Sequence, residues 1–173
     1  VARERERGTM ENLLAMPLRP MEVMAGKILP YVLIGAAQTV IIVGLSGLIF
    51  HVPFAGAAWL LALATLVFIT VSLLLGFTLS TFARTQMQAM QMSFFYILPS
   101  ILLSGFAFPY AGMPRWAQWI GEALPVTHFL RVVRGVMLKG WDAGEAVGQL
   151  AMLAALGAVF AVIAMRRYGD TLE

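Results

Sequence analysis

Apolar residues dominate three long stretches of the chain, and the breaks between them predict where helices begin and end. Asp, Glu, Lys and Arg are absent from residues 28–83, 85–114 and 146–165. About 20 apolar residues in a helix cross the hydrocarbon core of a bilayer, so each stretch is long enough for at least one crossing. The pattern predicts an all-α fold, a polytopic bundle of membrane helices.

The longest stretch must hold two crossings. It is 56 residues long, and a turn-like cluster containing His, Pro and Gly interrupts it at residues 51–56. A third span is expected after Arg84, and a last one before the pair Arg166 and Arg167. The four predicted spans cover residues 28–50, 58–82, 87–108 and 147–165.

The region between the third and fourth predicted spans has a different character. Residues 109–145 hold seven charges and three prolines, which divide the segment into short pieces. Two short amphipathic helices fit this pattern best, and the first carries Trp116 and Trp119. Because tryptophan prefers the interface between bilayer and water, we predict an outer helical hairpin over residues 114–138, either interfacial or re-entrant.

The distribution of Lys and Arg predicts the orientation. If the N-terminus is cytoplasmic, four spans place eight of the 12 basic residues inside, and this bias supports two cytoplasmic ends. Residues 1–27 are then a cytoplasmic segment, residues 28–165 the transmembrane domain and residues 166–173 a cytoplasmic tail. The net charge of +3 is thereby explained by membrane orientation, and no nucleic-acid partner is expected.

The composition and the missing motifs exclude several kinds of catalytic and cofactor-binding site. The chain is 60% hydrophobic and 12% charged, whereas soluble globular domains carry about 25% charged residues. It contains no cysteine, and neither of its two histidines belongs to a metal-binding or nucleophile-activating motif. No phosphate-binding P-loop motif occurs either. We therefore expect no catalytic residue, metal or bound cofactor in this chain, and no enzyme activity of its own.

The predicted spans contain hydroxyl and amide groups but no Asp, Glu, His or Lys. Ion-coupled transporters usually keep such a side chain at membrane depth, so energy for transport would have to come from another domain. The polar residues of the spans either line a path or join helices by hydrogen bonds. The candidates for lining a path are Gln88, Gln91, Tyr96 and Ser100.

Six residues of the predicted hairpin are candidates for a functional site. Glu122 either meets substrate or lies on a solvated helix face, and His128 is expected to be an interfacial ring with one edge in water. The six candidates are Trp116, Trp119, Glu122, His128, Arg131 and Arg134.

The N-terminal segment predicts a short amphipathic helix, from Thr9 to Met16. Thr9 is a plausible N-cap, Glu11 suits the first turn, and Met10, Leu13 and Leu14 form an apolar stripe that stops before Pro17. A helix of this length is not stable alone in water. It either docks on a cytoplasmic partner or lies flat on the lipid surface.

Several separated motifs resemble one known family. The run E-R-E-R-G-T-M-E-N-L-L-A-M-P-L-R-P-M-E-V-M-A-G-K-I-L-P-Y, from Glu4 to Tyr31, is similar to the cytoplasmic segment of type-2 permeases of ATP-binding-cassette (ABC) exporters. The stretches S-G-F-A-F-P at residues 104–109 and L-P-V-T-H-F-L-R-V-V-R-G-V-M-L-K-G at residues 124–140 resemble the region before that family's last span. The resemblance covers nearly the whole chain and matches the C-terminal portion of such a permease.

The resemblance implies roles for the predicted parts. Such permeases have six spans, so two spans are expected to precede Val1. The segment matching Thr9 to Met16 is the family's coupling helix, and the hairpin shapes the exit. The positions implied to contact the ATPase subunit are Gly8, Thr9, Glu11, Leu13, Leu14, Pro17 and Glu22.

The resemblance also implies partners and a location. The partners are an ABC ATPase subunit, which holds ATP and Mg, and a second permease copy or paralogue. The location is the bacterial cytoplasmic membrane. The expected function is ATP-driven export of a hydrophobic or amphipathic substrate. The alternative is a non-transporting membrane anchor or assembly subunit that binds a cytoplasmic partner.

Overall fold

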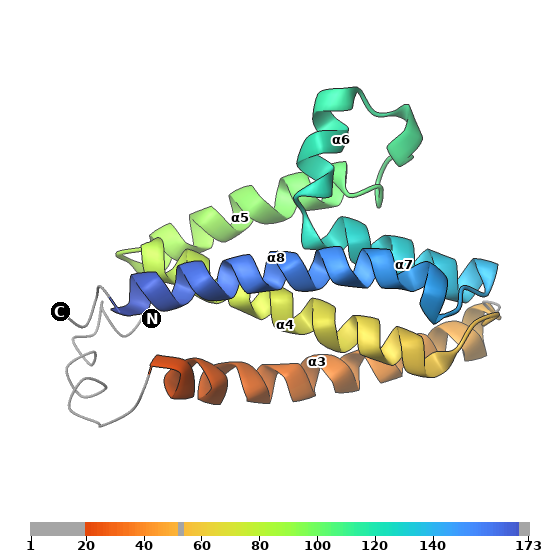
Figure 1. The fold of residues 1–173 in the computed structure, drawn as a ribbon, viewed down its shortest axis with the longest axis horizontal. Helices are drawn as coiled ribbons and strands as arrows, with labels where there is room; N and C mark the ends of the chain where they lie inside the picture. Colours follow the sequence, from red (N-terminus) through yellow and green to blue (C-terminus); the bar gives the residue numbers. More distant parts are fainter. Residues whose placement is uncertain (1–19, 52–53, 170–173) are drawn as a thin grey trace.

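The computed structural model describes residues 20–51 and 54–169, and over these residues the chain is helical without strands (Figure 1). The all-α class predicted from the hydropathy pattern is therefore confirmed. The elements are the α-helices α3 (Pro20–Phe50), α4 (Ala58–Phe82), α5 (Gln86–Leu103), α6 (Arg115–Glu122), α7 (Pro125–Lys139) and α8 (Ala143–Gly169), with a 3-10 turn, η1, at Tyr110–Gly112.

Three of the described helices are long and apolar enough to cross a membrane: α3 at Ile28–Ile49, α4 at Ala58–Phe82 and α8 at Ala143–Arg166. They coincide with three of the four predicted spans. Helix α8 begins at Ala143, four residues before the predicted start of the last span, because Asp142 caps its N-terminus. The Asp142 carboxylate accepts hydrogen bonds from the backbone N–H groups of Gly144 and Glu145 at 2.8 and 3.2 Å.

The remaining predicted span, residues 87–108, is only partly helical, because α5 ends at Leu103. Gly105 adopts a left-handed conformation (φ 85°), and the Ser104 hydroxyl accepts a hydrogen bond from the Phe106 N–H at 3.4 Å. The 18 residues of α5 span about 27 Å, slightly less than a bilayer core of about 30 Å. Three glutamines in its first six residues also lower its hydropathy.

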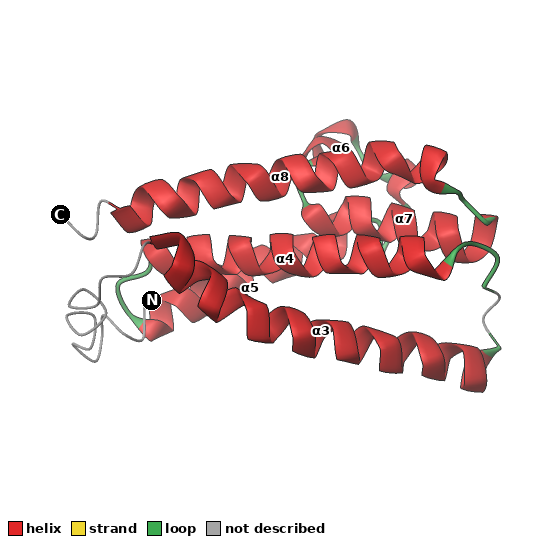
Figure 2. Ribbon diagram, turned by 60° about the horizontal axis from the view of Figure 1, so that its bottom comes forward, coloured by secondary structure: helices red, strands yellow, loops and turns green. Residues whose placement is uncertain are grey.

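Helix α4 is the centre of the bundle and contacts α3, α5, α7 and α8. The long helices run along one axis, with α6 standing off the side of the bundle (Figures 1 and 2). The start of α3, the turn between α4 and α5, and the end of α8 lie at one end of the bundle (Figure 1). Helices α3, α4 and α8 run the length of the bundle, whereas α5 ends beside α6, partway along it (Figure 1).

The main core lies where α7 packs against α4 and α8. Val132 and Val136 of α7 are fully buried there, together with Leu60, Ala64 and Ala146. The loop that precedes α4 packs directly against α7, and this contact requires a glycine. A Cβ at Gly56 would lie 2.5 Å from the Val136 carbonyl oxygen. The second hairpin helix is therefore an interior element of the bundle.

Helix α3 is packed much more loosely than the other long helices. No residue within its apolar span is buried, and large side chains such as Leu48 (77% exposed) face outward. Glu22, predicted to contact the ATPase subunit, lies exposed in the first turn of α3. The other six predicted coupling positions, Gly8, Thr9, Glu11, Leu13, Leu14 and Pro17, lie outside the described residues.

Candidate functional site

The hairpin predicted for residues 114–138 is present as α6 and α7. Pro114 precedes the first helix, and Pro125 is the first residue of the second. A proline costs no helical hydrogen bond there, because the N–H groups at the start of a helix have no partner within it. The buried Thr127 hydroxyl donates a hydrogen bond to the Gly121 carbonyl at 2.6 Å and ties the two helices together. Gly140 (φ 70°) ends α7 in a left-handed conformation.

Glu122, at the end of α6, is bound by two groups from different segments. Arg131 of α7 donates two hydrogen bonds to its carboxylate, one of them from Nη1 to Oε2 at 3.0 Å, and so forms a bidentate ion pair. The Tyr110 hydroxyl lies 2.6 Å from Glu122 Oε1, and the Arg131 guanidinium lies 4.7 Å from the centroid of the Tyr110 ring. The Glu122 side chain is 41% exposed, so the carboxylate is partly solvated and is also paired within the chain.

These contacts change the acidity of the three groups. Hydrogen bonds from Arg131 hold the pKa of Glu122 below its usual range, although partial burial opposes them. Burial, followed by the hydrogen bond to Glu122, raises the pKa of Tyr110. The hydrogen bond to Glu122 likewise raises the pKa of Arg131. The pair therefore stays ionised at neutral pH and closes the α6–α7 corner.

His128 lies beneath this pair, and its side chain is 1% exposed. Its Nδ1 is 2.8 Å from Gln149 Oε1 on α8, and its Nε2 is 2.9 Å from the Glu122 carbonyl oxygen. The two ring nitrogens of His128 thus meet polar partners on two different helices, α8 and α6. The interfacial ring with a wet edge is thus a wrong prediction, because α8 covers the histidine.

The remaining hairpin candidates fall into two groups. Arg134 donates a hydrogen bond to the Gly105 carbonyl at 2.8 Å and so holds the turn that follows α5. Trp116 and Trp119 are 61% and 74% exposed and face away from the bundle. Outward tryptophans suit the bilayer interface, as expected from the sequence.

Replacing Glu122 by glutamine is expected to loosen α6 from α7, because an amide cannot form the bidentate ion pair with Arg131. Hydrogen exchange of α6 amides at neutral pH should become faster in this variant. The lowered pKa means that the carboxylate stabilises the fold at neutral pH and loses this effect as the pH falls through its folded-state pKa. The difference between wild type and variant should therefore shrink in acid; a constant difference would contradict this role.

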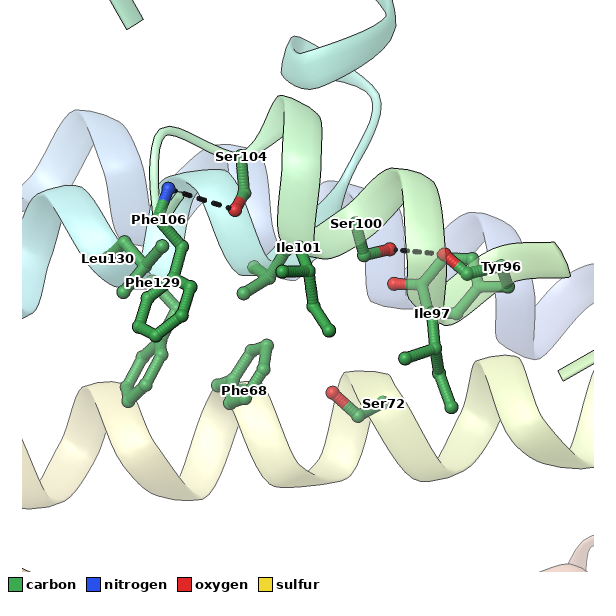
Figure 3. Close-up of a pocket in the computed structure, with 11 residues that line it drawn as sticks. Phe68, Ser72, Tyr96, Ile97, Ser100, Ile101, Ser104, Phe106, Phe129 and Leu130 are labelled. Atoms are coloured by element: carbon green, nitrogen blue, oxygen red, sulfur yellow. Dashed lines mark hydrogen bonds between the residues drawn. The ribbon is translucent and has the colours of Figure 1, made fainter. Parts of the chain in front are cut away.

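A second feature is a cavity of about 390 Å³ between α4, α5 and α7. Figure 3 shows Ser100, Ile101 and Ile97 of α5 opposite Phe68 and Ser72 of α4. Ser100 is buried and donates a hydrogen bond to the Tyr96 carbonyl at 2.7 Å. Two of the four predicted path-lining residues, Tyr96 and Ser100, therefore lie together on a real cavity.

The structure does not bring the other two predicted path-lining residues to this cavity. The Gln88 side chain accepts a hydrogen bond from the Arg84 N–H at 2.8 Å, and its own N–H donates to the Thr85 hydroxyl at 3.2 Å. Gln88 is thus a capping residue of the α4–α5 turn. Gln91 is exposed on the outside of α5 and does not line the cavity.

Three residues that sequence reasoning missed take part in these sites. Tyr110 and Gln149 complete the polar cluster at Glu122 and His128. Phe129 walls the cavity and stacks on Phe68, with ring centroids 4.2 Å apart and planes 5° from parallel. The apolar i, i+3 spacing of Phe129 and Val132 indicated a packing face but not its partner. Within residues 20–51 and 54–169, no group of His, Asp and Glu is arranged to hold a metal ion.

Comparison with known proteins adds independent information. Residues 1–138 match the family model described as "ABC-2 type transporter". The chain is 35% identical over 140 residues to "Probable multidrug ABC transporter permease YbhR" of Escherichia coli, covering 80% of this chain and 38% of that protein. It is 32% identical over 177 residues to "Inner membrane transport permease YhhJ" of the same species, covering 98% of this chain and 46% of that protein.

A more distant relative is "ABC transporter G family member 20" of Dictyostelium discoideum, 28% identical over 138 residues and matched over 19% of its length. No solved structure gives a significant match. The chain thus spans less than half the length of these relatives. The family match, together with helices that can span a membrane, supports the resemblance seen in the motifs. The chain belongs to the ABC-2 type transporter family and corresponds to part of its membrane permease.

Proposed function

We propose that this chain forms part of the membrane subunit of an ATP-driven exporter for hydrophobic or amphipathic molecules. ATP and Mg are bound by a separate ATPase subunit, not by this chain. The predicted coupling helix, residues 9–16, and the start of α3 at Pro20 receive the motion of that subunit. The membrane is the bacterial cytoplasmic membrane, and both ends of this segment face the cytoplasm.

The observation that carries the proposal is the absence of acidic, basic and histidine side chains from the apolar parts of the membrane helices in an ABC-2 family chain. Residues 28–49 of α3, 58–82 of α4, 86–103 of α5 and 146–165 of α8 contain hydroxyls and amides but no Asp, Glu, Lys, Arg or His. Such helices cannot bind and release a coupling proton at membrane depth. A nucleotide-hydrolysing partner supplies the energy instead.

In this proposal the path runs along α5. Its cavity-facing side combines apolar residues with the hydroxyls of Ser100 and Ser104, and Ser72 of α4 faces them. The opposite side exposes large apolar groups, with Phe94 63% and Phe95 77% exposed. A hydrophobic substrate moves along such a surface without losing solvation at a charged group.

We further propose that α5 is a fourth crossing and that α6 and α7 form a re-entrant hairpin. Helix α5 leaves the α4–α5 turn at one end of the bundle and ends at α6, which stands off the side of the bundle, and α7 continues from there to the other end (Figure 1). The burial of α7 between α4 and α8 supports the re-entrant alternative over a surface helix. A second permease copy or a paralogue covers the exposed faces of α3 and α5, which no described residue of this chain covers.

Vesicle transport tests the proposal. The full-length permease is reconstituted with and without its candidate ATPase, and export of a fluorescent hydrophobic dye is followed after ATP is added. Transport should require both the ATPase and hydrolysable ATP, and an imposed proton or sodium gradient should not replace them. Transport driven by a gradient alone would contradict the proposal. Complex formation without ATP-dependent transport would favour the membrane-anchor alternative.

A further inference from the structure

The corner between α6 and α7 lies well inside the ends of the long helices. His128 at this corner contacts Gln149, the seventh residue of α8, so the contact lies about 9 Å from the start of that helix. Arg131 precedes the last residue of α7 by eight positions, which is about 12 Å along the helix axis. The end of α7 lies at the end of the bundle, because the Ala55 N–H in the loop before α4 donates a hydrogen bond to the Met137 carbonyl at 3.1 Å.

This depth places the corner within the hydrocarbon core of a bilayer. The apolar span of α8 has 24 residues and is about 36 Å long, whereas the core is about 30 Å thick. If the span is centred in the core, about 3 Å of helix extends beyond the core at each end. The corner is then about 6 Å or more below the boundary between the core and the head groups.

Charged groups are nevertheless exposed at this corner, outside the four proposed crossings. The side chains of Glu122 and Arg131 are 41% and 30% exposed in the described part of the chain. Two of the five N–H groups of the guanidinium donate to the carboxylate, so hydrogen-bonding capacity is left on the exposed side of the pair. Lipid tails offer no hydrogen-bond partner, and charged groups at membrane depth face the interior of a bundle or a water-filled cavity.

The polar surface continues along α7 toward the end of the bundle. Arg134 lies three residues beyond Arg131, nearly one turn further along the same face of the helix, and it is exposed. Its guanidinium donates a hydrogen bond to the Gly105 carbonyl at 2.8 Å. The two arginines form an exposed polar strip that leads outward from the corner, and contact of this strip with lipid is unfavourable.

We propose that the α6–α7 corner lines a water-filled vestibule that opens toward the outer side of the membrane. Water pairs with the exposed atoms of Glu122, Arg131 and Arg134, and it reaches the corner along the arginine face of α7. A second protein chain on this face would need its own polar groups opposite the pair, whereas water supplies both donors and acceptors. The inference rests on the proposed re-entrant placement and orientation of the hairpin, but not on ATP or on export.

Single cysteines test the proposal, because residues 1–173 contain none. Ala123→Cys places a thiol at an exposed position beside Glu122, and Lys139→Cys samples the exposed end of α7. Met152→Cys is the apolar control, since Met152 is exposed on α8 about 14 Å from the start of that helix. The full-length permease in right-side-out vesicles, without an ATPase, is treated from outside with a membrane-impermeant cationic methanethiosulfonate. The permease without an added cysteine gives the background.

The expected rates follow from the chemistry of the thiol. Thiols react as thiolates, which form in water but not in lipid. The cysteine of Ala123→Cys should therefore react within about tenfold of the rate for Lys139→Cys, and the cysteine of Met152→Cys at least about a hundredfold more slowly than that of Lys139→Cys.

A second measurement shows whether the ion pair itself faces the reagent. The rate at Ala123→Cys is compared for a cationic and an anionic methanethiosulfonate of similar size, because the ratio of the two rates cancels changes in access. Glu122→Gln leaves the charge of Arg131 uncompensated, so the ratio of cationic to anionic rates should fall about threefold to tenfold. Arg131→Gln should raise the ratio by a similar factor.

Three results would overturn the proposal. Reaction at Ala123→Cys as slow as at Met152→Cys would place the corner against lipid or beneath another chain. Equal rates at all three cysteines would place the hairpin outside the bilayer. Rate ratios that respond to neither charge variant would show that the pair does not face the vestibule. A failure of ATP-driven export would contradict only the proposed function, because the labelling requires neither ATP nor the ATPase.

Discussion

Replacing Leu13 and Leu14 together by aspartate is expected to abolish ATP-dependent export and the stimulation of the ATPase by the permease. These leucines form the apolar stripe of the predicted coupling helix. Each unpaired charge buried at that contact would cost about 3–5 kcal/mol, so docking should weaken by far more than tenfold. The measurement is dye export and ATP hydrolysis in reconstituted vesicles.

A matched variant separates the effect of the stripe from that of added charge. Asn12 and Ala15 lie on the opposite face of the same predicted helix, because they are rotated by about half a turn from the leucines. Asn12→Asp with Ala15→Asp adds two acidic side chains but leaves the stripe intact, so export should persist. Equal loss in both double variants, or no loss in either, would exclude docking through the leucine stripe.

Replacing Val132 by aspartate is expected to prevent stable folding of the membrane domain. Val132 is fully buried where α7 meets α4 and α8, and none of the residues in this core cluster is charged. A buried charge without a partner costs about 3–5 kcal/mol, a large part of the stability of a typical domain. The variant should show little folded protein by size-exclusion chromatography in detergent and a strongly lowered melting temperature.

Leu138→Asp is the control on the same helix, because Leu138 is 60% exposed. It should fold with a melting temperature close to that of wild type. If α7 instead lay on the bilayer surface, Val132→Asp would be tolerated about as well as Leu138→Asp. That outcome would contradict the burial of α7 in the bundle and with it the re-entrant placement.

The spans could be predicted because the bilayer imposes a local rule. A helix crosses lipid only if it carries a sufficiently long run of apolar residues, and this property is visible in a window of about 20 residues without any knowledge of neighbours. Residues 28–50 and 58–82 were accordingly located almost to the residue. The predicted hairpin was found from its prolines, charges and tryptophans for the same local reason.

The predictions that differ from the structure share a cause, because each depends on a contact between distant or neighbouring segments. The third span was extended beyond Leu103 because its apolar run continues, whereas the backbone turns at Gly105 and is held there by Arg134, 29 residues further along. Gln88 was considered for the path because an amide in a membrane helix is unusual, but it caps the preceding turn. Composition identifies such groups as polar; it does not say which partner each one meets.

The sequence by itself therefore determined the class of this protein, the positions of its long helices and, through separated motifs, its family. The tertiary structure alone decided that Glu122 pairs with Arg131, that His128 is covered by α8 at Gln149, and that Tyr96 and Ser100 line a cavity whereas Gln88 and Gln91 do not. The physical reason is that membrane insertion depends on local sequence, whereas side-chain contacts depend on residues far apart in the chain. Transfer of an apolar segment into lipid depends on the residues of that segment, whereas hydrogen bonding and burial depend on which other helices pack beside them.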